Sequence, residues 1–348
     1  MTRHLACAAL ALCVPAAAWA ETLADAVAAA YDRNPQMVQQ RYLQKARDEG
    51  YVQARGQYGP TVSATTTGGY TRDDRDTVIG RQIEKGDSQE SSVTISQPLY
   101  TSGRIRGQVE AARASVLGGQ EQVRLTEQQI VQDVIVVYAA VLRDQARVEI
   151  GRENVAVLEG QLRQNRKRQE VGDVTLTDVA QSDARLAAAQ WQLAALEADL
   201  AVSRGQYVEI VGHNPGALEP LPMLGALPPT IDAAFDLAEK NNPSLAISRY
   251  VEQQSSATAA STRGQGGPTL SVSAQGVYSN QLLRFGNNGS RTQATAAFTL
   301  SQPIFSGGII RSRIRQADAR NRADQAGIDL ARRTAMQSVT SAWVDLSS

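Results

Sequence analysis

The sequence has 348 residues, and its 35 basic and 35 acidic side chains balance, which argues against a nucleic-acid partner because phosphate contacts require a basic surface. Its two cysteines, Cys7 and Cys13, both lie near the N-terminus, so the rest of the chain has no thiol for a disulfide or a metal site. The one histidine beyond that region, His213, is expected to be a solvated loop residue, and we expect no catalytic residues, no metal, no cofactor and no enzyme activity.

Residues 1–20 have the pattern of a signal peptide. Arg3 gives a basic start, residues 5–17 are almost wholly apolar, and the Ala-Trp-Ala of residues 18–20 supplies the small side chains of a cleavage site. The apolar run is too short to cross a bilayer, which takes about 20 residues, and neither cysteine stands at its end to carry a lipid. No later run approaches about 18 consecutive apolar residues, so we expect any membrane-inserted part to consist of strands.

The next region, residues 21–211, alternates helix and strand patterns. Its predicted elements are, in chain order, short helices at 22–33 and 35–58, strands at 61–70 and 91–99, a long helix at 103–171, a turn at 171–177 and a return helix at 176–211. The strands show period-two alternation, and the charged, turn-rich stretch 71–90 between them predicts a long polar loop.

The pattern of this first repeat returns later in the chain. Gly59-Pro60 is echoed by Gly267-Pro268 at an offset of 208 residues, and Ser96-Gln97-Pro98 by Ser301-Gln302-Pro303 at an offset of 205. Landmarks in the same order at nearly constant offset indicate a tandem duplication. After a linker at 212–229, the second repeat, 230–348, is predicted to contain a helix at 230–263, strands at 269–280 and 292–304, and a helix at 308–348.

Heptad spacing governs the long helices. Apolar residues recur at steps of four, three and seven, at Ile130, Val134, Val137, Val141, Val148, Val155, Leu158 and Leu162, then at Val179, Leu186, Leu193 and Leu200. This period predicts coiled-coil packing. A helix of about 68 residues extends roughly 100 Å, so the two shorter helices of the repeat could stack end to end along it.

Four strands are too few for a closed membrane barrel, which starts at about eight. An open edge in lipid leaves backbone groups without partners, so strands in lipid would require several copies of the chain. Two copies give eight strands and three give twelve. Aromatic side chains near the strand ends fit a membrane interface or ordinary strand packing, and prolines mark the strand–helix junctions. These residues are Tyr70, Tyr100, Phe298 and Phe305, and Pro60, Pro98, Pro268 and Pro303.

Together, the paired Asn-Pro helix starts, the two Ser-Gln-Pro strand exits and the Val-Gly-x-x-x-x-Thr-Asp-Val turn starting at Val171 resemble the TolC family of outer-membrane efflux and type I secretion proteins. The resemblance covers nearly all of the chain after residue 20. It implies a mainly helical fold with membrane strands: a homotrimer that shares a 12-stranded barrel in outer-membrane lipid above a helical periplasmic tunnel. The implied partners are a periplasmic membrane-fusion adaptor and an inner-membrane ABC or RND pump, and no nucleic acid.

The turn between the two long helices is the predicted adaptor contact. Gly172 can adopt the left-handed conformation that ends a helix, and Thr175 with Asp178 has capping-box spacing. The resemblance implies adaptor contact by Val171, Gly172, Asp173, Val174, Thr175, Thr177 and Asp178. The residues alone fit equally a tight helix–helix turn.

At the offset of 205, Ser348 corresponds to Arg143, so the second repeat has no counterpart of residues 144–211. In the family, much of the periplasmic gate lies there, and we interpret the chain as C-terminally truncated. A non-functional fragment of an efflux duct and a trimeric adhesive coiled coil are the alternatives. The duplicated hairpins argue against the adhesin, which would have one membrane segment at one end.

Overall fold

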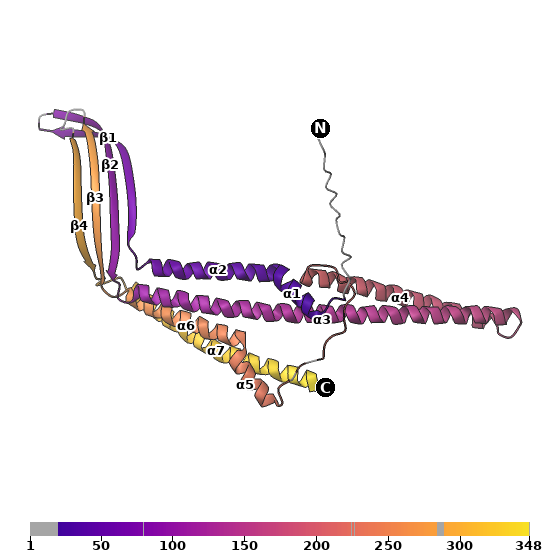
Figure 1. Ribbon diagram of the computed structural model, residues 1–348. Coiled ribbons are helices and arrows are strands. Elements are labelled where there is room, and N and C mark those ends of the chain that lie inside the picture. Colours follow the sequence, from indigo (N-terminus) through magenta and orange to yellow (C-terminus); the bar gives the residue numbers. More distant parts are fainter. Residues whose placement is uncertain (1–19, 79, 224, 226, 284–288, 348) are drawn as a thin grey trace, which may run out of the picture. The chain divides into compact units, whose positions relative to one another are not determined.

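The computed structural model describes residues 20–78, 80–223, 225, 227–283 and 289–347, and the predicted signal peptide up to residue 19 lies outside the described residues. Within these residues the chain forms seven helices and four strands (Figure 1). In chain order they are α1 (Leu23–Arg33), α2 (Pro35–Gly56), β1 (Thr61–Thr77), β2 (Gly80–Tyr100), α3 (Arg104–Glu170), α4 (Leu176–Val211), α5 (Ile231–Asn241), α6 (Pro243–Gly264), β3 (Thr269–Leu283), β4 (Gly289–Ser301) and α7 (Ile309–Ser347).

The described residues divide into two compact units that cut across the two sequence repeats. The first unit takes in residues 20–39 and 126–227, and the second takes in 40–125 and 228–347. The long helix α3 contributes its first part to the second unit and the rest to the first unit. The two units therefore reflect which helices pack together, and they do not coincide with the two sequence repeats.

The first unit has a small apolar core at the junction of α1, α4 and α3. Its buried side chains include Ala26, Ala30, Met37, Val134, Tyr138, Val141, Tyr207 and Val211. Two of them, Val134 and Val141, are predicted heptad positions of α3, which supports the predicted helix face. Beyond this core, Val148 and Leu162 of α3 and Leu200 of α4 are also buried, as expected for paired helices.

The start of the first unit is fixed by the linker after α4. Glu21 forms a parallel bridge with Leu218, and its carboxylate Oε1 lies 2.9 Å from Nε2 of His213. The expectation that His213 is simply solvated is therefore wrong, because folding brings it to a carboxylate 192 residues away in the sequence. The phenol of Tyr138 also donates to the Glu21 carbonyl at 2.8 Å.

By length and composition alone, α3 contains a stretch apolar enough to cross a membrane. Core helices of soluble proteins share that property. Polar residues are scattered through this stretch, so it contains no long uninterrupted apolar run although its mean hydropathy is high. Much of the apolar character of α3 comes from its heptad positions, which pack in the first unit.

The second unit carries a four-stranded antiparallel sheet in the order β1-β2-β3-β4 (Figure 1). The predicted long loop at 71–90 is wrong. Strands β1 and β2 pair continuously from Thr61↔Ser96 to Thr77↔Gly80. A bidentate ion pair between Asp74 and Arg81 links them near the turn. The backbone pairing of this outer part does not depend on an apolar alternation, so its polar sequence did not reveal the strands.

Two further predicted boundaries differ from the structure. Residues 230–263 form two helices, because Pro243 lacks an N–H and Asn242 caps a new helix, its Oδ1 accepting from Ser244 N at 2.8 Å. The last strand is β4, Gly289–Ser301, rather than 292–304. It ends before Pro303, which has no N–H for a strand ladder.

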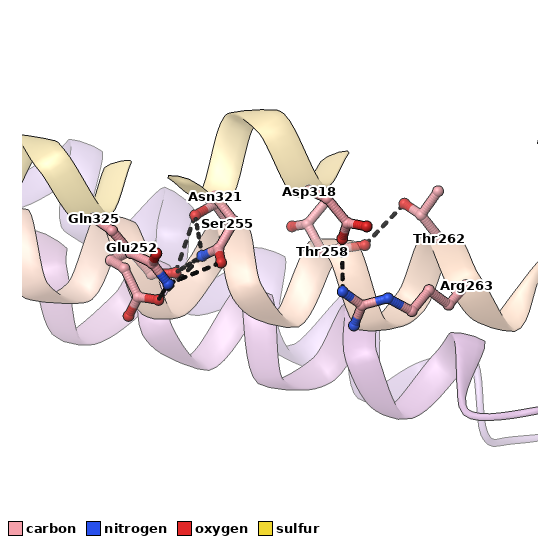
Figure 2. Close-up of polar contacts among 8 residues, drawn as sticks. All are labelled: Glu252, Ser255, Thr258, Thr262, Arg263, Asp318, Asn321 and Gln325. Atoms are coloured by element: carbon pink, nitrogen blue, oxygen red, sulfur yellow. Dashed lines mark hydrogen bonds and ion pairs between the residues drawn. The ribbon is translucent and has the colours of Figure 1, made fainter. Parts of the chain in front are cut away.

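A polar seam joins α6 to α7 (Figure 2). The Asn321 amide Nδ2 donates to the Glu252 carboxylate at 3.0 Å and lies 3.2 Å from the Ser255 hydroxyl. One turn away from Asn321 on α7, Asp318 accepts a hydrogen bond from the Arg263 guanidinium of α6 at 2.6 Å. These bonds fix the register of the two helices, since a shift of either helix would break both contacts.

Close approach of α3 to α6 joins the first repeat to the second. A Cβ placed on Gly107 would lie 2.6 Å from the Ser261 nitrogen and 2.8 Å from the Ala257 carbonyl oxygen. A Cβ on Gly264 would lie 2.7 Å from the Arg104 nitrogen. Both glycines are therefore required by packing rather than by backbone conformation, because any side chain would force the helices apart.

We predict that Gly107→Ala destabilises the protein by about 1–3 kcal/mol, the usual cost of overpacking a close contact. The matched control is Gly205→Ala, at an exposed position of α4 with no described atom within 4 Å of the added Cβ. The control should gain about 0.5–1 kcal/mol from helix propensity. Thermal unfolding followed by circular dichroism measures both, and an unchanged Tm for Gly107→Ala would refute the steric account.

Candidate functional site

The turn between α3 and α4 is built from the predicted residues. After Glu170 ends α3, Gly172 adopts φ +80°, the left-handed conformation that favours glycine. Its N–H donates to the Gln169 carbonyl at 3.0 Å, and the Asp173 N–H donates to the Arg168 carbonyl at 2.9 Å. These bonds satisfy carbonyls at the end of α3, so the chain reverses within five residues.

A capping box then starts α4. The Asp178 N–H donates to the Thr175 hydroxyl at 3.2 Å, and the Asp178 carboxylate accepts from the Thr175 N–H at 2.8 Å and from its hydroxyl at 2.7 Å. Hydrogen bonds from the Thr175 side chain and backbone lower the pKa of Asp178, and Arg168 adds to the effect. The turn is thus held by local polar contacts rather than by a core.

The apolar side chains of this turn face solvent. Val171 is 79% exposed and Leu176 is 73% exposed, while Val174 is half-buried. Around them, Arg168 pairs with Asp173 at 2.7 Å. Leu176 was missed by the sequence argument, which followed the family motif and did not consider the first residue of the return helix. The turn is held by the capping box and the Arg168–Asp173 ion pair, and it exposes the apolar side chains of Val171 and Leu176.

Strand register separates the sheet into two chemically different faces, because residues paired directly across strands point to the same face. One face carries apolar rows that run across all four strands. These rows are Val62, Ile95, Ala274 and Ala296, and next to them Ala64, Val93, Gly276 and Ala294. Val62 is 67% exposed and Val93 is 50% exposed, so the single chain leaves this apolar face uncovered.

The opposite face is mainly hydroxyl and amide. Its rows are Thr61, Ser96, Ser273 and Ala297, then Ser63, Thr94, Gln275 and Thr295, then Thr65, Ser92, Val277 and Gln293. The sequence alternation was compatible with this division but did not show that the polar positions of four strands line up. The register supplies that alignment.

Three of the predicted interface aromatics, Tyr70, Tyr100 and Phe298, lie on the apolar face by register, toward opposite ends of the strands. They are 66%, 54% and 75% exposed, respectively. Phe305 follows β4 and lies outside the sheet, 89% exposed. Tyr278 lies on the same face beyond the apolar rows and was missed, although it stands two residues from the end of the predicted strand 269–280.

Both outer strands of the sheet have one unpaired edge. Strand β1 pairs only with β2, and β4 pairs only with β3, within the described residues. Each edge carries a row of backbone donors and acceptors directed away from the sheet. The sheet of one chain is therefore open on both sides.

The four junction prolines occupy corresponding places in the two repeats. Pro60 and Pro268 precede β1 and β3, Pro98 lies next to a bulge in β2, and Pro303 follows β4.

A glutamine beside two of these prolines was also missed. The Gln97 amide donates to the Tyr58 and Pro98 carbonyls, and Gln302 donates to the Gly266 and Pro303 carbonyls at 3.1 Å each. The duplicated Ser-Gln-Pro motif thus ties each strand exit to the neighbouring helix–strand turn.

Comparison with known proteins identifies the family. A model of the outer membrane efflux protein family matches residues 26–213 and 234–348. The chain belongs to this family. The family assignment agrees with the TolC resemblance and makes the chain an outer-membrane channel protein of efflux or type I secretion.

Individual relatives are distant. The chain is 26% identical to the outer membrane efflux protein BepC of Brucella suis over 95% of this chain and 71% of BepC. It is 28% identical to the alkaline protease secretion protein AprF of Pseudomonas aeruginosa over 80% of this chain and 57% of AprF. A solved membrane protein from Pseudomonas aeruginosa has the same fold, with a TM-score of 0.78, 20% identity, and 92% of this chain and 76% of that chain covered.

The named relatives are efflux and secretion proteins rather than enzymes. In the part of the chain that the structure describes, no group of three or more His, Cys, Asp or Glu side chains could hold a metal ion. The candidate site consists of three surfaces: the apolar sheet face, the open strand edges and the exposed helical turn.

The capping box predicts a pH response at the start of α4. Because the folded-state pKa of Asp178 lies below its unfolded value of about 3.9, its stabilising effect is present above about pH 4 and is lost as pH falls through the folded pKa. Amide protection of residues 176–179, measured by hydrogen–deuterium exchange and corrected for intrinsic rates, should fall in that range.

Asp178→Asn is the control, since it should show weaker protection at neutral pH and no acid step. Equal protection of both proteins across the titration would contradict the capping account.

Proposed function

We propose that three copies of this chain close a 12-stranded barrel in the outer membrane and that their helices continue as a duct into the periplasm. The observation that carries this proposal is the open four-stranded sheet with one apolar and one polar face. The predicted signal peptide, residues 1–20, would direct the chain across the inner membrane.

Backbone chemistry supports closure. In lipid, each unpaired N–H or C=O costs several kcal/mol, so the free edges of β1 and β4 need partners. Pairing β4 of one copy with β1 of the next satisfies both edges without any other protein. Three copies give the twelve strands implied by the family, and a ring of strands leaves no edge.

The two faces of the sheet suit the two sides of such a barrel. The apolar rows around Val62 and Val93 would contact outer-membrane lipid, and the rows of Ser, Thr and Gln would line a water-filled lumen. Tyr70, Tyr100 and Phe298 would then lie toward the two membrane interfaces, where amphipathic and aromatic rings are favoured. Phe305 would lie just beyond the sheet, on the helical side.

The helical turn would contact a partner at the periplasmic end. Val171 and Leu176 are exposed apolar side chains on a braced turn, a surface suited to the helices of a periplasmic membrane-fusion adaptor. The adaptor would connect the duct to an inner-membrane ABC or RND pump. Export would proceed by passage through the duct, with no chemical step on this chain.

Internal duplication predicts the register between copies. Within the chain, Ser96 of β2 pairs with Ser273 of β3. The repeat offsets convert this pair into Ser301 of β4 and Thr65 of β1, so Thr65→Cys with Ser301→Cys should form a disulfide between copies. The expected product is a reducible covalent oligomer on non-reducing electrophoresis of outer membranes.

The matched control is Thr61→Cys with Ser301→Cys, which moves one thiol four residues along β1, about 13 Å. This pair should remain monomeric. Equal cross-linking of both pairs would refute the register, and the absence of cross-links in either would refute closure through β1 and β4.

A substitution in the turn tests adaptor contact. Gly172→Val places a β-branched residue at φ +80°, which costs on the order of 1–2 kcal/mol and distorts the turn locally. Cells carrying this variant should lose most export while the oligomer in the outer membrane remains intact. Gly205→Val, at an exposed position of α4, is the control and should export normally. Normal export by Gly172→Val would exclude the turn as the contact.

A further inference from the structure

Arginine gathers where four of the helices meet the sheet. Helices α2 and α6 end just before β1 and β3, and helices α3 and α7 start just after β2 and β4 (Figure 1). The junction segments 51–60, 101–109, 260–268 and 302–314 contain six arginines and no acidic residue. We call these six the arginine collar: Arg55, Arg104, Arg106, Arg263, Arg311 and Arg313.

Strand register brings the four junctions to the same end of the sheet. Thr61 at the start of β1 pairs with Ser96 near the end of β2. Likewise, Thr269 at the start of β3 pairs with Ser301 at the end of β4. The arginine collar therefore lies at one end of the sheet, the end that carries the helices.

Most of the charge of the collar is uncompensated within the described chain. Arg263 pairs with Asp318 at 2.6 Å. Among the described residues, the other five arginines have no carboxylate within ion-pair distance. Arg106, Arg311 and Arg313 are exposed. Because acidic and basic residues balance over the whole chain, this end of the sheet carries a local excess of positive charge.

Helix polarity makes the collar unfavourable for the isolated chain. The N-terminus of a helix carries a partial positive charge, so acidic side chains stabilise the first turn and cations destabilise it. Helices α1, α4 and α5 follow this rule, each with an aspartate in its first turn. Helices α3 and α7 have no acidic residue there and carry Arg104, Arg106 and Arg311 instead. An anion from outside the chain would offset this repulsion.

Exposed apolar side chains border the collar on the side of the sheet. Ile304 and Phe305, between β4 and α7, are 94% and 89% exposed. Tyr58, between α2 and β1, is 49% exposed. Apolar and aromatic side chains followed by cations are typical of a membrane interface, where the rings lie at headgroup level and the cations attract anionic lipid.

A groove beside the collar has room for a lipid headgroup. It lies between α3 and α6, has a volume of about 770 Å³, and has Arg106 and Arg263 near its sheet end. Farther from the sheet it is lined by Arg113 together with Glu110 and Glu252, so its charge there is mixed. Guanidinium groups bind phosphate oxygens through paired hydrogen bonds. The sheet end of the groove is therefore the part suited to a phosphate.

We propose that the arginine collar binds the phosphate groups of anionic phospholipids in the periplasmic leaflet of the outer membrane. The inference rests on the proposed barrel, which places the sheet in lipid and the helical end of the sheet at the periplasmic leaflet. The collar then sets the depth of the barrel, because a shift one way would bring arginines into hydrocarbon and a shift the other way would separate them from phosphate.

The test measures the lipid preference of the full-length protein in phosphatidylcholine vesicles by electron paramagnetic resonance. Spin-labelled phosphatidylglycerol should associate with the protein more strongly than spin-labelled phosphatidylcholine, and the difference should shrink at high salt. Arg106→Gln with Arg311→Gln should lower this preference by roughly fivefold, the order expected when cations near an anionic leaflet are lost.

The matched control is Arg322→Gln with Arg333→Gln. It removes the same charge from exposed positions of α7, about 16 Å and 33 Å beyond Arg311, and should keep the wild-type preference. Inorganic phosphate should not displace the spin-labelled lipid. Displacement at millimolar phosphate would assign the collar to a free anion and overturn the lipid contact.

Three other results would contradict the proposal. These are no preference for phosphatidylglycerol in the wild-type protein, an equal loss in both double variants, and loss of the oligomer in Arg106→Gln with Arg311→Gln. The last result would show that these arginines join the copies instead of binding lipid.

Failure of the lipid contact is distinguishable from failure of the barrel, because the Thr65→Cys and Ser301→Cys pair reports closure independently. If this pair cross-links and the lipid preference is absent, the collar assignment is wrong and the barrel stands. If the pair does not cross-link, the proposed barrel fails, and with it the placement of the collar at the leaflet.

Discussion

The backbone N–H and C=O groups at the two edges of the sheet have no strand partner within the described chain, and the proposed function depends on this constraint. Four strands carry an apolar face suited to lipid, yet β1 and β4 each leave one edge unpaired in the described chain. Lipid offers no hydrogen bonds, so a sheet of this kind is stable there only as part of a closed ring. In lipid, this sheet would therefore need further copies of the chain, which the proposed barrel of three copies supplies.

Duplication is the means by which one chain can provide both sides of such a ring. Strands β2 and β3 pair within the chain, and the repeat places their counterparts at the two outer edges. Among the helices, α3 packs against α6 within the chain, whereas their counterparts in the other repeat, α7 and α2, leave Ile309 and Tyr42 exposed. Glycine at position 107 allows the close crossing of α3 and α6.

Much of this architecture could be predicted from sequence because strong local signals and the repeat agree. Heptad spacing located the buried side of α3, and the capping pair Thr175 and Asp178 located the start of α4. The outer part of the first hairpin was mispredicted, since residues 71–90 are charged and their pairing is stabilised by cross-strand backbone bonds and by Asp74 with Arg81. Local polarity does not reveal such pairing.

Other features depend on contacts between distant segments, which a single sequence does not show. The glutamines of the Ser-Gln-Pro motifs were visible, but their carbonyl partners were not. Tyr278 and Leu176 were not predicted as site residues, because the strand register of the first and the exposed fraction of the second are known only from the structure. Native mass spectrometry of the particle extracted from outer membranes tests the central claim most directly: the account predicts three chain masses, and a particle of one or two chains would contradict it.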